Sequence, residues 1–151
     1  MSLAVHLFAI ACVLGACAPT HEVLQTHRLT LERLTPEQSC TRGVSAARAS
    51  ASTGTIRIVL CDSKLHEPLV GVTVVAEPDV KTGLTDSDRR AEITDDAGTA
   101  TITLMSPGNY KLTLYYGDLD ISAGDFAIAA GSSLLIIGAV DSTRYLGEVI
   151  I

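Results

Sequence analysis

The sequence predicts an all-β fold, a sandwich of two packed sheets that follows a short N-terminal arm. Beyond residue 54, apolar and polar residues alternate with a period of two, the pattern of strands that bury one face. Turn residues interrupt this pattern about every ten residues. Short alternating strands with regular turns are typical of a β-sandwich.

The chain begins with an apolar stretch that is typical of a secretory signal. Residues 1–16 contain no Lys, Arg, Asp or Glu, and the apolar run from Leu3 to Leu14 is interrupted only by His6. A membrane-spanning helix needs about 20 apolar residues, so this stretch is too short to be one. Its length fits the hydrophobic region of a signal peptide.

The residues that follow resemble a bacterial lipobox. The run Leu14-Gly15-Ala16-Cys17 closes the apolar stretch. The resemblance implies that residues 1–16 are removed, that the Cys17 thiol carries diacylglycerol, and that the new amine is acylated. Ala18 in the next position resembles sorting to the outer membrane. Ordinary cleavage around Ala16-Cys17-Ala18 is the alternative, and Pro19 disfavours it because its ring suits a protease poorly.

Residues 17–54 are predicted to form a flexible, lipid-anchored tether with one short helix. Leu29, Leu31 and Leu34 are spaced for either a short strand or a helix face. The run Thr35-Pro36-Glu37-Gln38 supplies an N-cap, a proline for the first turn and a capping-box glutamine. We therefore expect a helix from Thr35 to about Thr41. The stretch 43–54, rich in Ala, Ser and Gly, is typical of a linker.

Two of the four cysteines are expected to form a disulfide. Cys12 leaves with the signal and Cys17 is the lipid site, so Cys40 and Cys61 remain. In an oxidising compartment an even remainder indicates a bridge. A zinc site is disfavoured because zinc needs four ligands and His66 is the one nearby imidazole. Alternation points Cys61 away from the core, so the bridge would fix the arm across the outer side of the sheet or at its edge.

The sandwich domain is predicted to span residues 55–151. Alternation places one set of side chains in the core: Ile56, Ile58, Leu60, Val72, Val74, Ala76, Ala100, Ile102, Leu104, Tyr110, Leu112, Leu114 and Tyr116. Further strands are predicted at 90–94, 118–122, 126–129 and 133–139. The last is apolar on both faces, so we expect it to be central or covered. The run Asp95-Asp96-Ala97-Gly98 predicts a hairpin turn.

The order of these pieces resembles the carboxypeptidase regulatory-like domain. The resemblance covers about residues 54–140 and rests on these segments: Gly54 to Asp62, Pro68-Leu69, Gly71-Val72, Thr94-Asp95 with Gly98, and Pro107-Gly108 before Tyr110. It implies a transthyretin-like, immunoglobulin-like sandwich of seven strands. In peptidases this domain is an accessory, so the resemblance implies no proteolysis. The polar insertion from Asp79 to Arg89 is longer than the family's usual connection.

The charge pattern excludes one class of partner. The formal net charge is −6, and the acidic excess lies in the sandwich domain. An acidic domain without a basic stripe cannot release phosphate counterions, so nucleic-acid binding is excluded and anionic head groups are disfavoured. We expect an envelope or surface protein as partner and contact with the membrane through the lipid anchor. The oligomeric state is left open.

Several positions invite a site hypothesis. Asp86, Asp88, Asp95 and Asp96 are weak calcium candidates, since calcium prefers carboxylate and carbonyl oxygens. Ordinary turn chemistry is favoured over calcium, because Arg89 and Arg90 follow where an EF-hand would continue with ligands. No cofactor is expected.

Catalysis is also disfavoured, because the sequence offers no complete set of catalytic residues. His66 sits in a predicted loop without an assigned nucleophile, and Arg57 or Arg144 is its one candidate partner. Small-molecule hydrolases of the transthyretin-like fold use a His/Arg constellation and a Tyr-Arg-Gly-Ser-like ending, which this chain lacks. The sequence therefore predicts a non-catalytic lipoprotein, a structural or protein-interaction module at the outer membrane.

The alternative to a protein-interaction module is a carbohydrate- or calcium-dependent ligand-binding domain. The chain has no Trp to stack on a sugar, and Tyr115 and Tyr145 are the exposed aromatic candidates. The C-terminal residues Val149, Ile150 and Ile151 either complete a sheet or offer an edge to a partner, and completion is favoured.

Overall fold

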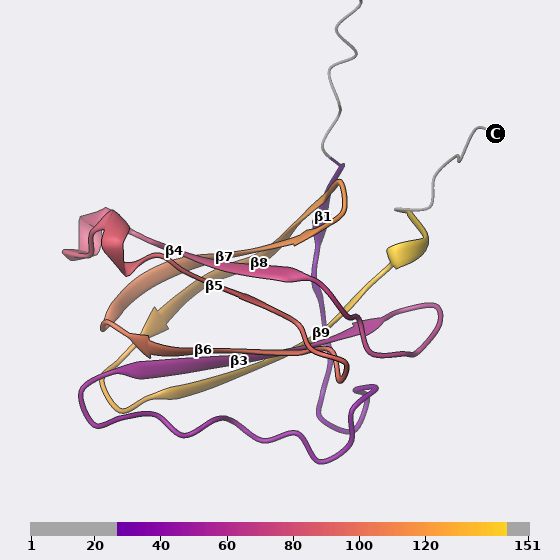
Figure 1. The fold of residues 1–151 in the computed structure, drawn as a ribbon, viewed down its shortest axis with the longest axis horizontal. Helices are drawn as coiled ribbons and strands as arrows, with labels where there is room; N and C mark the ends of the chain where they lie inside the picture. The colour runs from indigo at the N-terminus through magenta and orange to yellow at the C-terminus, as the bar shows by residue number, and fades with distance from the viewer. Residues whose placement is uncertain (1–26, 145–151) are drawn as a thin grey trace, which may run out of the picture.

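The computed structural model describes residues 27–144 and confirms the predicted all-β sandwich (Figure 1). One sheet has five strands in the order β1-β8-β7-β4-β5, and the other has four in the order β2-β9-β3-β6. The signal residues 1–16, the lipid-site candidate Cys17 and the C-terminal Val149, Ile150 and Ile151 lie outside the described residues.

The nine strands of residues 27–144 are divided between the two sheets. The five-stranded sheet contains β1 (His27–Thr30), β4 (Thr73–Pro78), β5 (Arg90–Ile93), β7 (Gly108–Tyr116) and β8 (Leu119–Ile128). The four-stranded sheet contains β2 (Glu32–Arg33), β3 (Gly54–Asp62), β6 (Thr99–Met105) and β9 (Ser133–Val140). Three 3-10 helices complete the fold: η1 (Val80–Thr82), η2 (Asp86–Asp88) and η3 (Ser142–Arg144). The sandwich predicted beyond residue 54 thus has its seven strands, β3 to β9.

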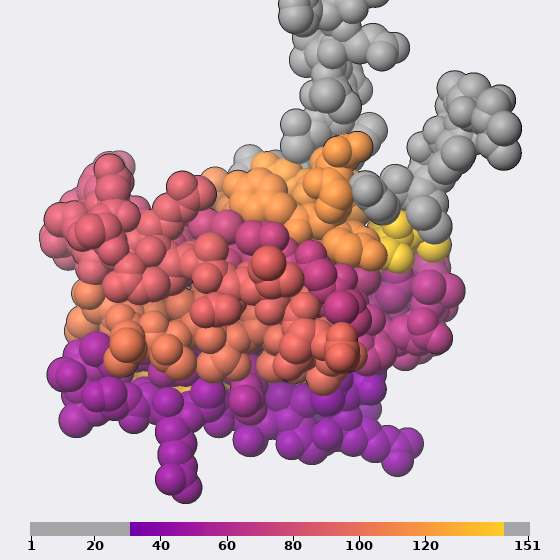
Figure 2. Space-filling model, in the orientation of Figure 1, coloured from indigo at the N-terminus to yellow at the C-terminus, as the bar shows by residue number. Residues whose placement is uncertain are grey.

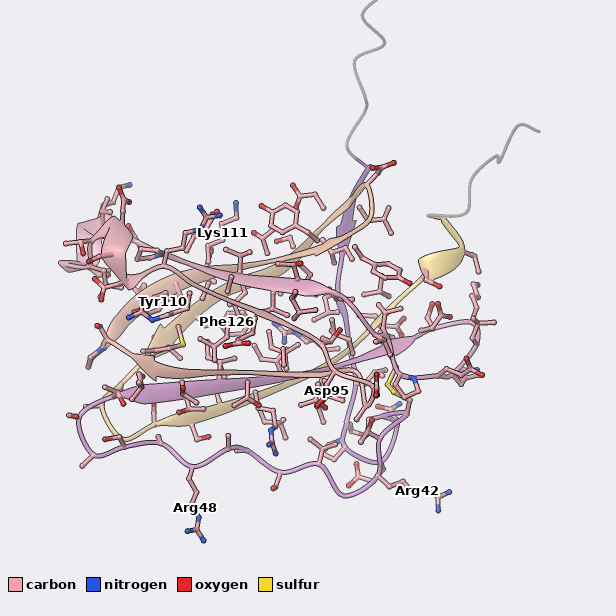
Figure 3. All side chains as sticks on the ribbon, in the orientation of Figure 1. Arg42, Arg48, Asp95, Tyr110, Lys111 and Phe126 are labelled. Atoms are coloured by element: carbon pink, nitrogen blue, oxygen red, sulfur yellow. A yellow bond between two sulfur atoms is a disulfide. The ribbon has the colours of Figure 1, made fainter. Side chains whose placement is uncertain are left out.

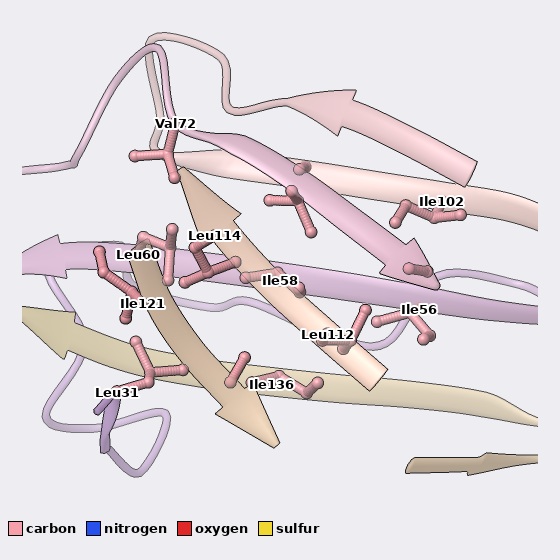
Figure 4. Close-up of a cluster of buried hydrophobic side chains, with 14 of the residues drawn as sticks. Leu31, Ile56, Ile58, Leu60, Val72, Ile102, Leu112, Leu114, Ile121 and Ile136 are labelled. Atoms are coloured by element: carbon pink, nitrogen blue, oxygen red, sulfur yellow. The ribbon is translucent and has the colours of Figure 1, made fainter. Parts of the chain in front are cut away.

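One core fills the space between the sheets (Figure 4). The side chains predicted to face inward on β3, β4 and β7 and just before β4 pack there, and eight of them are 0% exposed: Ile56, Ile58, Leu60, Val72, Val74, Ala76, Leu112 and Leu114. Strand β9 is central, as expected, because it pairs with β2 on one side and β3 on the other. Burial of these inner faces drives the two sheets together.

One predicted core residue, Leu104, lies outside the core. Its side chain is 65% exposed, and Met105 takes the inward position at 0% exposed. The ladder between β3 and β6 shifts register between Gly54 and Ile56, and Leu104 has a φ of 56°. An extra residue in one strand reverses the alternation beyond it, so a strict period of two fails at this point.

The turn Asp95-Asp96-Ala97-Gly98 is not a hairpin turn between paired strands. Strand β5 pairs with β4 and β6 pairs with β3, so the turn carries the chain from one sheet to the other. The Asp95 carboxylate accepts hydrogen bonds from the backbone N–H groups of Ala97 (3.0 Å) and Thr99 (2.9 Å). These local bonds determine the turn but not the strands that pair beyond it.

Part of the predicted tether belongs to the sandwich. Strand β1 pairs in parallel with β8, β2 pairs antiparallel with β9, and Leu31 between them enters the core at 5% exposed. A Cβ at Gly138 would lie 2.4 Å from Leu31 Cγ, so only glycine leaves room for this side chain. The residues 27–33 therefore close the side of the sandwich formed by β8 and β9.

The helix expected from Thr35 to about Thr41 is a turn instead. The capping pattern itself forms, because Thr35 N donates to Gln38 Oε1 and Gln38 N donates to Thr35 O, both at 3.0 Å. The Ser39 hydroxyl bonds the carbonyl oxygens of Pro36 and Thr41, which competes with helical hydrogen bonding. The chain is then bonded to β3 through Cys40 and does not propagate a helix.

The stretch predicted as a flexible linker lies over the outer face of the four-stranded sheet (Figure 2). We call residues 40–53 the covering segment. Its backbone accepts hydrogen bonds from Arg57 at Ser45 O (3.0 Å), from Thr55 at Arg48 O (3.4 Å) and from Ser133 at Ala47 O. These contacts hold a sequence of small residues in place.

Two apolar side chains lie under this cover. Val59 and Ile137 are direct partners in the β3–β9 ladder and face away from the core, yet they are 0% and 4% exposed. The covering segment thus buries the apolar outer side of β3 and β9. This agrees with the expectation that an all-apolar β9 is covered.

Candidate interaction surface

The predicted disulfide is present and fixes the covering segment to the sheet. Cys40 and Cys61 are bonded, with 5.7 Å between their Cα atoms. Cys61 lies on the outer side of β3 and is 3% exposed. The Cys40 backbone N–H also donates to Cys61 Sγ at 2.8 Å. The bridge therefore anchors the arm on the outer side of the sheet, as the sequence predicts.

The two outer faces of the sandwich differ in what covers them. The covering segment runs along the four-stranded sheet, whereas no element of residues 27–144 crosses the outer face of the five-stranded sheet (Figure 1). Lys111 lies on that uncovered side, opposite Arg42 and Arg48 of the covering segment (Figure 3). A partner therefore meets one closed face and one open face.

Strand register arranges the open face in rows that cross the strands. Glu77, Lys111 and Asp125 are neighbours across β4, β7 and β8, and Arg89 lies 3.6 Å from Glu77. Charge alternates in sign along this row, and each pair is exposed to solvent, so the row adds little to stability. Its fixed order of charges is a pattern that a complementary surface can match.

A second row beside it is small and buried. Val75 and Thr113 are partners across β4 and β7, and they are 4% and 3% exposed although they face outward. The third row contains Ile93, Thr73 and Tyr115, with Ile93 62% and Tyr115 38% exposed. The face therefore changes from charged to apolar along the strands. These rows could not be predicted from the sequence because they depend on register between distant strands.

The charged row lines a hollow of about 580 Å³ on the open face. The lining contains the carboxylates of Glu77, Asp79 and Asp125 and a single ammonium group, Lys111. The Phe126 ring lines the hollow, and the Arg33 guanidinium stacks on that ring, 4.9 Å from its centroid. Burial lowers the pKa of Arg33, and the guanidinium also donates to Ala123 O at 2.5 Å.

The structure does not gather the four calcium candidates. Asp86 and Asp88 lie in η2 before β5, and Asp95 and Asp96 follow β5, which separates the pairs by about 13 Å at roughly 3.3 Å per residue. Among residues 27–144, no group of three or more His, Cys, Asp or Glu side chains is placed to hold a metal ion.

Two of these carboxylates have local partners. Asp88 Oδ1 accepts from Ser106 Oγ at 2.6 Å and Oδ2 accepts from Thr85 N at 2.9 Å, and these bonds lower its pKa. The Asp95 carboxylate is occupied by the turn described above. Both serve as turn and cap residues, which is the favoured interpretation of the sequence.

The structure also separates His66 from Arg57, one of the two arginines named as its partner. Arg57 donates to Ser45 O and Thr101 Oγ1 in the middle of β3, about 17 Å along the strand from Asp62. His66 belongs to the loop beyond that strand. Its backbone N–H donates to Asp62 O at 3.0 Å. His66 and Asp62 line a second hollow, of about 350 Å³, beside the disulfide. Arg57 does not line it.

Asp62 is the one buried carboxylate in that hollow. Oδ1 accepts from the backbone N–H groups of Lys64 and Leu65, both at 2.7 Å. Oδ2 accepts from the N–H (3.2 Å) and the hydroxyl of Ser142. Burial alone would raise its pKa, but the hydrogen bonds from Ser142, Leu65 and Lys64 together outweigh burial and hold the pKa below its ordinary value.

Comparison with known proteins gives fold-level similarities alone. No family model matches the chain, and no curated protein matches it. In the part of the chain that the structure describes, no helix has the length and apolar character to cross a membrane.

Several solved structures are distantly similar to part of this chain. The Bacillus anthracis TIE protein is 19% identical over 58% of this chain and 16% of its own, with a TM-score of 0.44. BcpA, the major pilin subunit of Bacillus cereus, is 16% identical over 58% of this chain and 30% of its own, with a TM-score of 0.39. An intradiol ring-cleavage dioxygenase from Tetranychus urticae is 14% identical over 65% of this chain and 64% of its own, with a TM-score of 0.39. This chain thus spans less than a third of the first two proteins.

Proposed function

We propose that this protein is a non-catalytic outer-membrane lipoprotein, anchored through Cys17, that binds another envelope or surface protein with the outer face of its five-stranded sheet. Its sandwich is of the carboxypeptidase regulatory-like type. The observation that supports the proposal is the difference between the faces: one is closed by a disulfide-bonded segment, and the other is open.

The open face has the mixed character of a protein-binding surface. It joins an apolar row that contains Tyr115 and Ile93 to a charged row centred on Lys111. Protein interfaces combine buried aromatic anchors with a polar rim, and charge order sets orientation and partner choice. A flat sheet face presents such groups at fixed positions and needs little ordering on binding.

The anchor keeps this face close to the membrane. Residues 17–26 would span at most about 35 Å when fully extended, at about 3.5 Å per residue. Three acyl chains make the attachment effectively permanent, so the partner must reach the same short distance. This restricts the partner to another envelope component or a protein that docks at the membrane surface.

Cross-linking in intact envelopes tests the proposal. The native chain is cross-linked, purified and analysed by mass spectrometry, beside Lys111→Glu on the open face and Arg48→Glu on the covering segment. Both substitutions reverse an exposed charge, so they are matched. We expect one discrete partner with the native chain, a loss of about tenfold or more with Lys111→Glu, and native recovery with Arg48→Glu.

Other results would exclude parts of the proposal. Loss of the partner with Arg48→Glu and not with Lys111→Glu would place binding on the closed face and reject the open face. Recovery of no specific protein with the native chain rejects the interaction role. Cys17→Ala should release the chain from the membrane fraction, and its retention would reject the lipid anchor.

A further inference from the structure

Exposed apolar side chains gather at one end of the sandwich. Six large hydrophobic residues are exposed within the described chain, and four of them define what we call the terminal patch: Leu65 (61% exposed), Val70 (45%), Ile93 (62%) and Tyr115 (38%). Val80 and Leu104 lie at the other end, in η1 and near the end of β6. Contiguous exposed apolar patches mark contact sites, so we expect another apolar group to cover the terminal patch.

Topology places these four residues together. Leu65 and Val70 belong to the loop that joins the end of β3 to the start of β4. Thr73, at the start of β4, pairs with Ile93 on one side and with Tyr115 on the other. Gly71 N donates to Thr94 O at 3.0 Å, which holds the loop against the end of β5.

The C-terminal end of the described chain leaves at this same end (Figure 1). Strand β9 ends at Val140 opposite Asp62, and η3 follows. The Asp62 carboxylate binds Ser142 through one oxygen and the N–H groups of Lys64 and Leu65 through the other. One side chain therefore fixes the exit of the C-terminal segment beside the loop that carries Leu65 and Val70.

We propose that the C-terminal residues 145–151 dock on the terminal patch and cover it. Their sequence, Tyr145-Leu146-Gly147-Glu148-Val149-Ile150-Ile151, supplies apolar side chains at five of seven positions. Extended, they reach about 23 Å at roughly 3.3 Å per residue, enough to follow the loop from η3 toward β5. The inference goes beyond the proposed function. The docked segment takes Ile93 and Tyr115 at the end of the open face, and the charged row centred on Lys111 stays open to a partner protein.

Two other occupants are disfavoured. A segment already attached beside its site has an effective concentration of about millimolar or more, which a second copy does not reach in dilute solution. A bilayer with anionic head groups is repelled, because Glu92, Asp95, Asp96, Asp118 and Asp120 lie at the same end. The chain's own C-terminal segment is the remaining apolar occupant.

Hydrogen exchange on the purified full chain tests the docking. It is compared with a chain that ends at Arg144 and with an Ile150→Asp variant, which keeps the length and removes the apolar character. We expect the amides of residues 64–71 and 91–93 to exchange about tenfold faster in both variants. The amides of η1 and η2, at the other end, should exchange at the native rate in all three proteins.

Digestion by a carboxypeptidase gives a second measurement, made on the C-terminal segment and not on the patch. Val70→Ser with Ile93→Ser should speed removal of Ile151, Ile150 and Val149 by about tenfold, because these residues leave the patch. Val80→Ser is the matched control, an exposed valine at the opposite end, and should leave the rate unchanged. Both changes are at exposed positions and preserve the fold.

Three results would overturn the inference. The first is identical exchange at residues 64–71 and 91–93 in the native and Ile150→Asp chains. The second is protection that disappears on dilution, which assigns the patch to a second copy. The third is protection that appears only with phosphatidylglycerol-containing vesicles, which assigns it to the membrane. None of these measurements depends on the partner sought in envelopes, so the two proposals fail separately.

Discussion

A single buried carboxylate joins three parts of the chain at the end of the sandwich. Asp62 ends β3, caps the loop through Lys64 and Leu65, and holds Ser142 at the start of η3. A carboxylate that accepts several hydrogen bonds is stabilised in its charged form, which explains the lowered pKa. The charge of Asp62 is therefore linked to the fold.

The Asp62→Asn substitution should destabilise the protein at neutral pH. An amide accepts fewer and weaker hydrogen bonds than a carboxylate, and we expect a loss of about 1–3 kcal/mol in the free energy of unfolding. Because the folded pKa lies below the unfolded value, near 3.9, this stability is present above pH 4 and is lost as pH falls through the folded pKa. Urea unfolding at several pH values measures it.

The control for this measurement is Asp86→Asn, an exposed change in η2. The difference between native and Asp62→Asn chains should shrink as pH falls below the unfolded value, while Asp86→Asn should follow the native curve throughout. An equal difference at every pH would show that Asp62 acts through packing and not through charge.

At the scale of elements, the disulfide and the covering segment act as one unit. Residues 40–53 have mostly small side chains and no regular structure, so they cannot hold themselves on the sheet by burial alone. The bond to Cys61 and the backbone acceptors at Ser45, Ala47 and Arg48 hold them there. Val59 and Ile137 remain buried as a result.

Replacing Cys40 and Cys61 together by alanine should destabilise this unit and the protein. The bridge closes a loop with a sequence separation of 21, which corresponds to about 3 kcal/mol in the loop-entropy model and a fall of roughly 10 °C in the melting temperature. Hydrogen exchange should rise in residues 40–53 and less in β7 and β8. Unchanged exchange in residues 40–53 would show that the backbone hydrogen bonds hold the segment alone.

The elements also show what local sequence determines. The alternating patterns of β3, β4, β7 and β9 predicted these strands, because burial of one or both faces leaves a direct trace in the sequence. The helix at Thr35 and the hairpin at Asp95 were wrong, since capping and turn residues determine only the next few backbone bonds. Bulges also leave no recognisable pattern in the sequence. One bulge moved Leu104 out of the core, and at another β8 continues through Gly124, where two strands were expected.

On the scale of the whole molecule, the two faces have different tasks and different origins. The closed face needs the arm. Its attachment could be predicted from two cysteines, whereas its cover over the sheet could not, because its Ala, Ser and Gly residues indicated a flexible linker. The open face is defined by register among β4, β5, β7 and β8, and no local pattern reveals that Lys111 stands between Glu77 and Asp125. The candidate surface therefore required the fold, although its residues are plain in the sequence.

Calcium should leave the stability of the whole protein unchanged. The four acidic candidates lie in pairs at opposite ends of β5, and two of them already serve local hydrogen bonds, so the described chain does not gather them into one site. At about 10 mM, above the dissociation constants of weak extracellular sites, calcium should not shift the thermal midpoint relative to magnesium. A rise specific to calcium would favour a ligand-binding domain.

The path of the arm sets how the molecule responds to force. A pull on its N-terminal side reaches His27 first, peels β1 from β8 and draws Leu31 out of the core. Peeling stops at Cys40, because the bond to Cys61 passes the load to β3 in the middle of its sheet. Residues 27–39, whose fully extended length is about 45 Å at roughly 3.5 Å per residue, therefore form the part of the chain that a pull extends before the load reaches β3.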